Sequence, residues 1–217
     1  MVEILYKSKT AIAIIKPAGV LSEGGSDGEN IAASLAEQLR ALGEPDELLA
    51  VHRLDRAVGG VMVFARDKES ARLLSEQFSG RETAKKYLAV VEGEAECEAE
   101  LSDYLYRDSA LLKAFVCDKR RIGAKACRLS YKRLAMTDTP YSLLLVTLGT
   151  GRFHQIRAQL SSRGLPIVGD GKYGAKNRRS GVALFSTSLT FNDAGKVVTV
   201  SAKPDKTQFP WSEFCVD

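Results

Sequence analysis

The chain has 217 residues, of which 45% are hydrophobic and 27% are charged. This length is enough to bury the core of one large domain or of two small ones, and the ordinary composition excludes collagen-like, fibrous and disordered proteins. No apolar run approaches the roughly 20 residues that a membrane-spanning helix needs. The N-terminus has no basic stretch followed by an apolar one, so we expect no export signal and no membrane partner. The formal net charge of +4 is too small to indicate a binding partner by itself.

Short apolar strands and two helices are predicted over the first 80 residues. Residues 11–15 are mostly β-branched and stop at Lys16-Pro17-Ala18-Gly19, a pattern typical of a strand that ends in a turn. Asn30 and Asp67 are suitable N-cap residues, and apolar side chains at helical spacing follow each of them. The predicted elements are a strand at 11–15, a loop at 22–30, a helix at 30–42, a strand at 61–65 and a helix at 68–78. The apolar face of the first helix holds Ile31, Leu35, Leu39 and Leu42, and that of the second holds Ala71, Leu74 and Phe78.

After Gly80 the pattern indicates mainly strands, most of them antiparallel members of a sheet. They are predicted at 87–91, 110–116, 126–134, 141–148, 183–191 and 197–201. A helix from Thr150 or Gly151 to Ser162 would carry a polar face with His154, Arg157 and Ser161 and an apolar face with Phe153, Ile156 and Leu160. Strands with interspersed helices, without a repeat or a linker, predict a single α+β domain.

The distribution of charge is more informative than its sum. Residues 113–133 and 151–179 hold fifteen Lys and Arg against only Asp118 and Asp170, a net charge of +13 that leaves −9 for the rest of the chain. A protein that concentrates cations in this way can bind a polyanion. Charge runs also occur as plain solvated faces, and the two interpretations are about equally favoured before any chemistry is considered.

The cysteines and histidines do not indicate a metal site. Cys97, Cys117, Cys127 and Cys215 have neither C-x-x-C spacing nor a histidine at zinc-ligand spacing. Without an export signal they are expected to be reduced thiols in a cytoplasmic protein. The two glycine-rich stretches also fail as nucleotide-binding loops. Gly149-Thr150-Gly151 lacks the third glycine of a dinucleotide fingerprint, and Gly171-Lys172 lacks both the first glycine and the Ser/Thr of a P-loop.

The segment His52-Arg53-Leu54-Asp55-Arg56, followed by Gly59-Gly60, places one carboxylate among three basic side chains. Cations within about 4–6 Å would lower the pKa of such a carboxylate and keep it ionised. An ionised carboxylate on a loop loosened by glycines suits a nucleophile or a general base. An Arg–Asp pair that pins the loop is the alternative, and the residues alone do not decide between the two.

These residues belong to an ordered set of motifs that resembles the RluA-type pseudouridine synthases. His52-Arg53-Leu54-Asp55 with Gly60 is similar to the family's H-R-L-D-x-x-T-S-G. The other matching segments, in the family's order, are Lys16-Pro17-Ala18-Gly19, Lys85-Lys86-Tyr87, Thr150-Gly151-Arg152-Phe153-His154-Gln155-Ile156-Arg157, Pro166-Ile167-Val168-Gly169-Asp170 and Tyr173-Gly174. Each segment is weak alone, whereas the ordered set is specific and covers nearly the whole chain.

The resemblance implies a cofactor-free isomerase that converts a specific uridine of ribosomal or transfer RNA into pseudouridine. Asp55 corresponds to the nucleophile, Tyr87 to the family's active-site tyrosine, and Arg157 to the arginine that pairs with the nucleophile. Spacing alone would favour Tyr87 as a plain strand aromatic. The residues expected to bind substrate are His52, Arg53, Arg56, Arg152, His154 and Gln155. For His52 and Arg53, contact with RNA phosphate and bracing of the loop both remain open.

The resemblance also implies the pseudouridine synthase fold, a mixed and largely antiparallel sheet flanked by helices and loops. We expect one catalytic domain over residues 1–217, without a separate N-terminal RNA-binding module, acting as a monomer in the cytoplasm with no metal and no cofactor. Two departures from the motifs leave the subgroup and the target uridine open. Val58-Gly59 replaces Thr-Ser, and Phe185 replaces the histidine of a C-terminal L-H-[AS] motif.

Two other functions are weighed beside this one. A non-catalytic RNA-binding or chaperone protein on the same fold is argued against by the presence of Asp55, Tyr87 and Arg157. A hydrolase that uses Asp55 on a free nucleotide or sugar would not require polymeric RNA.

Overall fold

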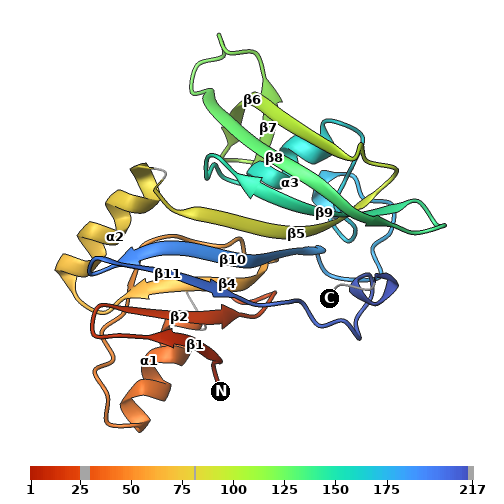
Figure 1. The fold of residues 1–217 in the computed structure, drawn as a ribbon. Coiled ribbons are helices and arrows are strands. Elements are labelled where there is room, and N and C mark those ends of the chain that lie inside the picture. The colour runs from red at the N-terminus through yellow and green to blue at the C-terminus, as the bar shows by residue number, and fades with distance from the viewer. Residues whose placement is uncertain (25–29, 81, 215–217) are drawn as a thin grey trace. The chain divides into compact units, whose positions relative to one another are not determined.

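The computed structural model describes residues 1–24, 30–80 and 82–214. The chain divides into two compact units, the first formed by Met1–Lys85 with Phe185–Pro204 and the second by Lys86–Leu184 with Asp205–Asp217. The prediction of a single catalytic domain stays a prediction. Figure 1 draws the elements of both units in chain order by colour.

The first unit is a small sheet with two helices. Its strands are β1 (Ile4–Lys7), β2 (Ala11–Lys16), β3 (Leu49–Ala50), β4 (Gly59–Ala65), β10 (Leu184–Asp193, from Phe185 on) and β11 (Lys196–Ser201), and its helices are α1 (Ile31–Ala41) and α2 (Lys68–Gly80). The strand order is β1-β2-β4-β10-β11, with β3 also pairing β4. All these pairs are antiparallel except β4 with β10.

The second unit is an antiparallel sheet that carries one short α-helix. Its strands are β5 (Ala84–Glu92, from Lys86 on), β6 (Glu98–Asp108), β7 (Lys113–Cys117), β8 (Lys125–Met136) and β9 (Tyr141–Leu148), in the order β5-β9-β8-β6-β7. The helices are α3 (Gln155–Ser161) and the 3₁₀ turns η1 (Gly171–Tyr173) and η2 (Trp211–Glu213). The expectation of an α+β fold with a mixed, largely antiparallel sheet is confirmed.

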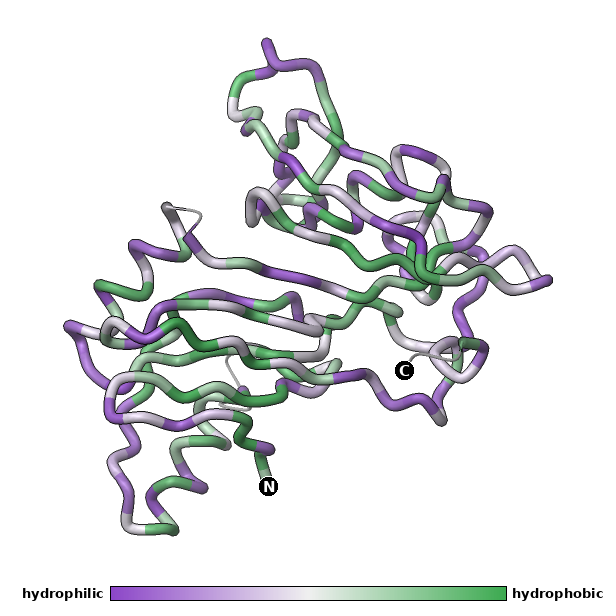
Figure 2. Tube along the Cα trace, viewed as in Figure 1, coloured by the Kyte–Doolittle hydropathy of each residue, from purple (hydrophilic) through white to green (hydrophobic). Residues whose placement is uncertain are grey.

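Buried β-branched strands form the centre of the first unit, as the apolar runs predicted. Every residue of β4 is buried, and in β2 only Ile15 is partly exposed; Figure 2 shows both strands as hydrophobic stretches. One face of these strands packs against Leu74 of α2 and against Phe191 of β10. Burying a large apolar side chain contributes about 1.5–3 kcal/mol, so this packing holds β4 in place where it leaves the loop that contains Asp55.

The helix caps follow the sequence prediction. The Asn30 side chain accepts a hydrogen bond from Ala33 N–H at 2.9 Å, and Asp67 accepts one from Ser70 N–H at 2.8 Å. The helix predicted to end at about Leu42 ends at Ala41, so Leu42 is not one of its apolar-face residues. As the C-cap residue, Leu42 is 64% exposed. Most of the predicted loop at 22–30 lies outside the described residues.

Two other predictions need correction. The strand at 110–116 begins only at Lys113, because the Asp108 carboxylate accepts the N–H groups of Ala110 and Leu111 and forms a turn that Leu112 leaves with φ +46°. The helix predicted from residue 150 begins at Gln155, so His154 lies outside it with φ +51°. All residues from Gln155 to Leu160 are buried, so Arg157 of the predicted polar face lies in the interior together with the apolar side chains.

Strands β1 and β6 were not predicted. The inward-facing positions of β6 hold Leu101 and Leu105 but also Asp103, so its alternation of apolar and polar residues is interrupted. Gln159 donates to Asp103 at 2.7 Å and Arg163 donates to it at 2.8 Å, which makes a partly buried carboxylate acceptable at this position.

Gly59 and Gly60 are not part of a flexible loop, contrary to expectation, because they are the first two residues of β4. Both are buried, and they pair in parallel with Phe185 and Ser186 of β10. Gly60 has φ +119°, and a Cβ at this position would lie 2.3 Å from the Ser186 carbonyl oxygen. The second glycine is therefore required by a close approach of two backbones.

We predict that Gly60→Ala destabilises the protein by about 3 kcal/mol or more, since the strain of a positive φ adds to a steric overlap with backbone. The control is Gly181→Ala, whose Cβ would meet no atom within 4 Å and whose φ is not positive. Urea denaturation of both variants checks this. Equal stability of the two variants would contradict it.

Candidate active site

Asp55 lies half-buried at the start of a tight turn between β3 and β4. The Val58 N–H donates to the Asp55 carbonyl at 2.9 Å, which closes the turn over residues 55–58. Gly19 N–H donates to the Arg56 carbonyl at 2.7 Å and joins this turn to the Lys16–Gly19 segment. Two segments about 40 residues apart in sequence therefore hold the backbone of the turn that carries Asp55.

Ser22 fixes the residue that precedes Asp55. Its hydroxyl donates to the Leu54 carbonyl at 2.9 Å and accepts from the Leu54 N–H at 3.1 Å. Both residues are buried, Ser22 at 4% exposed and Leu54 at 6%. One hydroxyl satisfies both backbone groups of Leu54 away from water. This contact therefore fixes the backbone conformation of the residue just before Asp55.

Lys16 is a fully buried cation next to the turn. Its ammonium donates to the carbonyls of Pro17 and Val20 at 2.8 Å each, and to that of Arg56 at 3.4 Å. Burial lowers the Lys16 pKa to about 8, and the opposing attraction of the Asp55 carboxylate raises it. Lys16, noted in the sequence only as part of a turn motif, is thus a buried cation that interacts with the charge of Asp55.

The arginines beside Asp55 lie at the surface. Arg53 is exposed and is 3.9 Å from a Glu23 carboxylate oxygen, a weak contact. Arg56 Nε donates to the Gly19 carbonyl at 2.8 Å, and this contact braces the turn from outside. Arg53 remains available to a ligand approaching Asp55, whereas Arg56 already has a structural partner.

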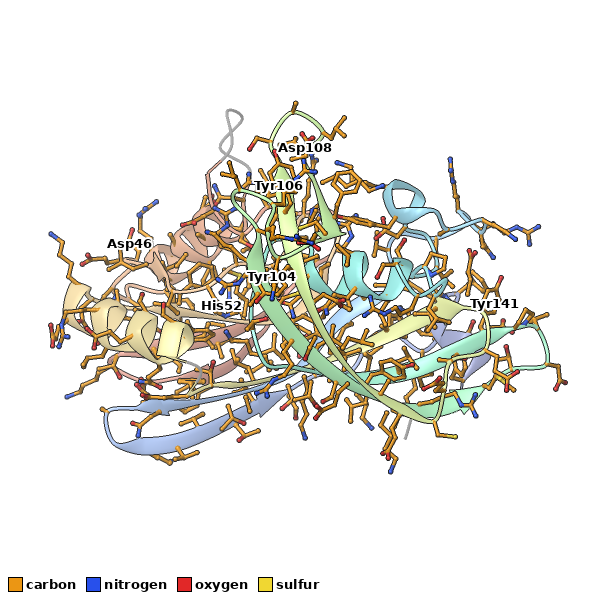
Figure 3. The ribbon with its side chains drawn as sticks, turned by 90° about the horizontal axis from the view of Figure 1, so that it is seen from above. Asp46, His52, Tyr104, Tyr106, Asp108 and Tyr141 are labelled. Atoms are coloured by element: carbon orange, nitrogen blue, oxygen red, sulfur yellow. The ribbon has the colours of Figure 1, made fainter. Side chains whose placement is uncertain are left out.

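His52 has bracing contacts. Its Nε2 accepts a hydrogen bond from Val63 N–H at 3.0 Å, and its ring stacks on Phe78 with centroids 4.5 Å apart; Figure 3 labels it. Burial, together with the nearby Lys85 charge, lowers the His52 pKa to about 3. An imidazole that accepts through Nε2 is neutral. Of the two roles left open, these contacts favour bracing over a charged contact with phosphate.

Arg157 of α3 is buried in the second unit and has a carboxylate partner there. Its guanidinium binds Asp170 through two bonds, Nε to Oδ2 at 2.6 Å and Nη2 to Oδ1 at 2.9 Å. Asp170 is 1% exposed, so the bidentate pair keeps both buried charges matched. Tyr173 packs its ring 5.0 Å from the same guanidinium.

Tyr173 also holds His154. The Tyr173 hydroxyl accepts from Ala114 N–H at 2.8 Å and lies 3.0 Å from His154 Nδ1, and Phe153 stacks on the imidazole at 3.8 Å. The tautomer of the imidazole decides which of these two atoms donates. His154 keeps a positive φ within this arrangement.

Gln155 and Arg152 brace the loop in front of α3. The Gln155 amide oxygen accepts from the Thr150 hydroxyl at 2.7 Å and from Arg152 N–H at 3.0 Å, while its nitrogen donates to the Arg128 carbonyl at 3.0 Å. Gln155 is 3% exposed, so its contacts favour a bracing role. Arg152 Nε donates to the Ala126 carbonyl at 3.2 Å, and the residue is exposed.

Tyr87 is 8% exposed on β5, opposite Val146 of β9.

The structure groups Asp55 with Lys16 and Ser22 in the first unit. It groups Arg157 with His154, Tyr173 and Asp170 in the second. Ser22 was not predicted to be a site residue. The sequence indicates this residue only by placing a small polar side chain shortly after the Lys16–Gly19 turn.

The two departures from the family motifs lie next to each other. Gly59 and Phe185 are register partners in the parallel pair of β4 with β10. A Cβ at Gly59 would lie 3.5 Å from Phe185 Cδ2 and 3.3 Å from both the Lys16 carbonyl oxygen and Ala18 N. The phenylalanine ring thus adjoins the space of the missing side chain, so the two replacements fit each other.

Within the described residues we find no group of three His, Cys, Asp or Glu side chains arranged to hold a metal ion. Nor does any helix in the described part of the chain have the length and apolarity to cross a membrane. Cys97, Cys117 and Cys127 are free thiols, and Cys215 lies outside the described residues.

Comparisons with known proteins agree with the motifs. A family model described as RNA pseudouridylate synthase matches residues 10–162. The tRNA pseudouridine synthase C of Yersinia pestis is 31% identical, in a match that covers 98% of this chain and 92% of that protein. The ribosomal large subunit pseudouridine synthase D of Borreliella burgdorferi is 32% identical, over 80% of this chain and 55% of that protein.

The fold is also shared with solved structures. Human RNA pseudouridylate synthase domain containing 4 superposes with a TM-score of 0.79 at 24% identity, covering 94% of this chain and 89% of that one. The resemblance inferred from the motifs is confirmed. The chain belongs to the RNA pseudouridylate synthase family and is an enzyme, a pseudouridine synthase.

Proposed function

We propose that this enzyme isomerises a specific uridine of transfer or ribosomal RNA, with Asp55 as the nucleophile. Both RNA classes occur in the names of its relatives, the Yersinia pestis protein for tRNA and the Borreliella burgdorferi protein for the large ribosomal subunit. The observation that carries the proposal is the bracing of the Asp55 turn by Lys16 and Ser22, because a nucleophile must be held in one geometry to react efficiently.

The chemistry requires one bond exchange and no redox partner. Asp55 attacks the target nucleotide and the bond between the ribose and the uracil nitrogen breaks. The uracil turns and rejoins the ribose through C5, and the Asp55 carboxylate is released. The C5 hydrogen leaves as a proton, and the uracil nitrogen that left the ribose takes up a proton, so that the atoms balance. Tyr87 is proposed to stack on the uracil or to assist removal of that proton, and Arg157 to pair with the nucleophile.

A uridine inside folded RNA must first leave its stack, which costs a few kcal/mol. Phosphate contacts by the basic segments 113–133 and 151–179 offset this cost. Arg53 is exposed beside Asp55. It is proposed to contact the RNA backbone at the place in the stack that the target uridine has left. The same exposure makes Arg152 a candidate for phosphate contact. His154 is proposed to contact the substrate, and Gln155 to hold the loop that carries His154.

We predict that Asp55→Asn abolishes isomerisation and leaves the fold and RNA affinity almost unchanged, since the amide keeps the shape of the carboxylate but is not a nucleophile. The assay is release of tritium from RNA labelled at uridine C5, using total RNA from cells that lack this gene. Circular dichroism and a filter-binding assay serve as controls. Undiminished tritium release by the variant would rule out Asp55 as nucleophile.

We further predict that Ser22→Ala lowers the turnover number by about 10-fold to 100-fold, because the loosened Leu54 backbone misplaces Asp55. Ser142→Ala is the matched control. Ser142 is 0% exposed, and its hydroxyl likewise joins two backbone groups, Gly93 O at 2.8 Å and Ala95 N at 3.0 Å.

Both serine variants leave buried backbone groups without a partner, so each should lose about 1–3 kcal/mol of stability. Only Ser22→Ala should lose turnover at unchanged KM, and Ser22→Thr should restore it. Equal turnover in the two alanine variants, measured below their melting temperatures, would reduce Ser22 to a structural role.

The charge distribution predicts a salt dependence much steeper than +4 suggests. Each phosphate neutralised contributes about −0.7 to the slope of log affinity against log salt for single strands. Replacing Lys119, Arg120 and Lys125 by Gln should therefore reduce the slope by about 2. The same change at the exposed residues Lys9, Lys68 and Lys196, outside both basic segments, should leave it unaltered. Equal slopes for the two triple variants would mean that residues 113–133 do not face RNA.

A further inference from the structure

Three aromatic rings lie on one face of the β6–β7 hairpin in the second unit. The register places Tyr106 of β6 directly opposite Phe115 of β7. Tyr104 is two residues before Tyr106 on the same strand, and alternate residues of a strand share a face. Figure 3 labels Tyr104 and Tyr106 along β6. We call these three side chains the aromatic face.

The aromatic face does not belong to the core of its unit. The opposite face of the same hairpin provides the buried residues Leu105 and Ala114, which pack with Ala158 of α3. Tyr104 remains 37% exposed and Phe115 remains 38% exposed. Clustered aromatic side chains that a fold leaves in water are more informative than single exposed apolar residues, because they mark binding surfaces.

Cations surround the aromatic face and partly stack on it. The Arg121 guanidinium carbon lies 3.8 Å from the centre of the Tyr106 ring, and the Lys113 ammonium lies 5.2 Å from that of Phe115. Lys119 and Lys125 lie exposed in and after the loop that carries Arg121. Through the described parts of the chain, none of these four cations has a carboxylate within ion-pair distance.

The two acidic residues nearest to this face are already engaged. Asp108 caps the turn at the end of β6 by accepting two backbone N–H groups at 2.9 Å. Asp118 accepts from the backbone and the side chain of Arg120, at 2.8 Å and 3.2 Å. Lys113, Lys119, Arg120, Arg121 and Lys125 outnumber these two carboxylates, so the face has an excess of positive charge and suits a polyanion with aromatic groups.

We propose that the aromatic face binds unpaired nucleotides of the substrate RNA by stacking bases on Tyr104 and Phe115. Lys113, Lys119, Arg121 and Lys125 contact the adjoining phosphates. Proteins recognise single-stranded RNA by this combination of exposed rings and a basic surround. A protein partner fits less well, because Lys is depleted from the cores of protein interfaces. The proposal rests on the proposed function. It adds that part of the bound RNA is single-stranded and lies on the β6–β7 hairpin.

The test is binding of a fluorescent twelve-nucleotide oligouridylate, measured by anisotropy, to the full chain and its variants. Tyr104→Ala and Phe115→Ala should each raise the dissociation constant by about five-fold to 100-fold, the range expected for loss of one stacked base. Tyr104→Phe keeps the ring and should bind as the parent does. The control is Leu134→Ala, which removes a side chain that is 46% exposed on β8, away from the hairpin.

Unchanged affinity in both ring-deleted variants, or an equal loss in Leu134→Ala, would overturn the proposal. So would a parent protein that sediments as a dimer and becomes a monomer on Tyr104→Ala, since the face would then be an interface between copies of the chain. Because this binding assay needs no turnover, its result is independent of whether Asp55 is the nucleophile. Tritium release by Asp55→Asn answers that second question separately.

Discussion

The structure around Asp55 in the first unit depends on one interaction, the binding of the buried Lys16 ammonium by backbone carbonyls. An ammonium inside a protein requires oxygen ligands in place of water, and here the carbonyls of Pro17, Val20 and Arg56 provide them. To supply these carbonyls, the turn after β2 and the turn that carries Asp55 must lie against each other. Lys16 therefore holds the turn that carries Asp55 in its conformation, and it also places a positive charge near this proposed nucleophile.

The surrounding contacts make this arrangement rigid. Ser22 fixes the chain before Asp55, and Gly60 fixes it afterwards through its close approach to Ser186. Backbone contacts on both sides of Asp55 thus hold the turn that carries its carboxylate. The second unit also holds a buried cation by oxygen ligands. Here the Asp170 carboxylate binds the Arg157 guanidinium through two parallel bonds.

Most of the fold could be predicted from local sequence patterns, and the exceptions have identifiable causes. The caps at Asn30 and Asp67 and the buried run of β4 depend on neighbouring residues, so the sequence reveals them. Strand β6 was missed because Asp103 occupies an inward position, and its partners Gln159 and Arg163 come from about 60 residues away. For the site, the motif resemblance indicated Asp55, Tyr87 and Arg157. The role of Ser22 depends on Leu54, 32 residues further along the chain, and no local pattern shows such a contact.

We propose that the braced carboxylate of Asp55 is the nucleophile that converts one or a few uridines of cellular RNA. Mapping pseudouridines at nucleotide resolution in cells that lack this gene, complemented with either the parent chain or Asp55→Asn, tests it most directly. We predict that defined pseudouridines in tRNA or rRNA disappear on deletion, return with the parent chain and stay absent with the variant. Identical maps in the deleted and complemented cells, or restoration by Asp55→Asn, would contradict the account.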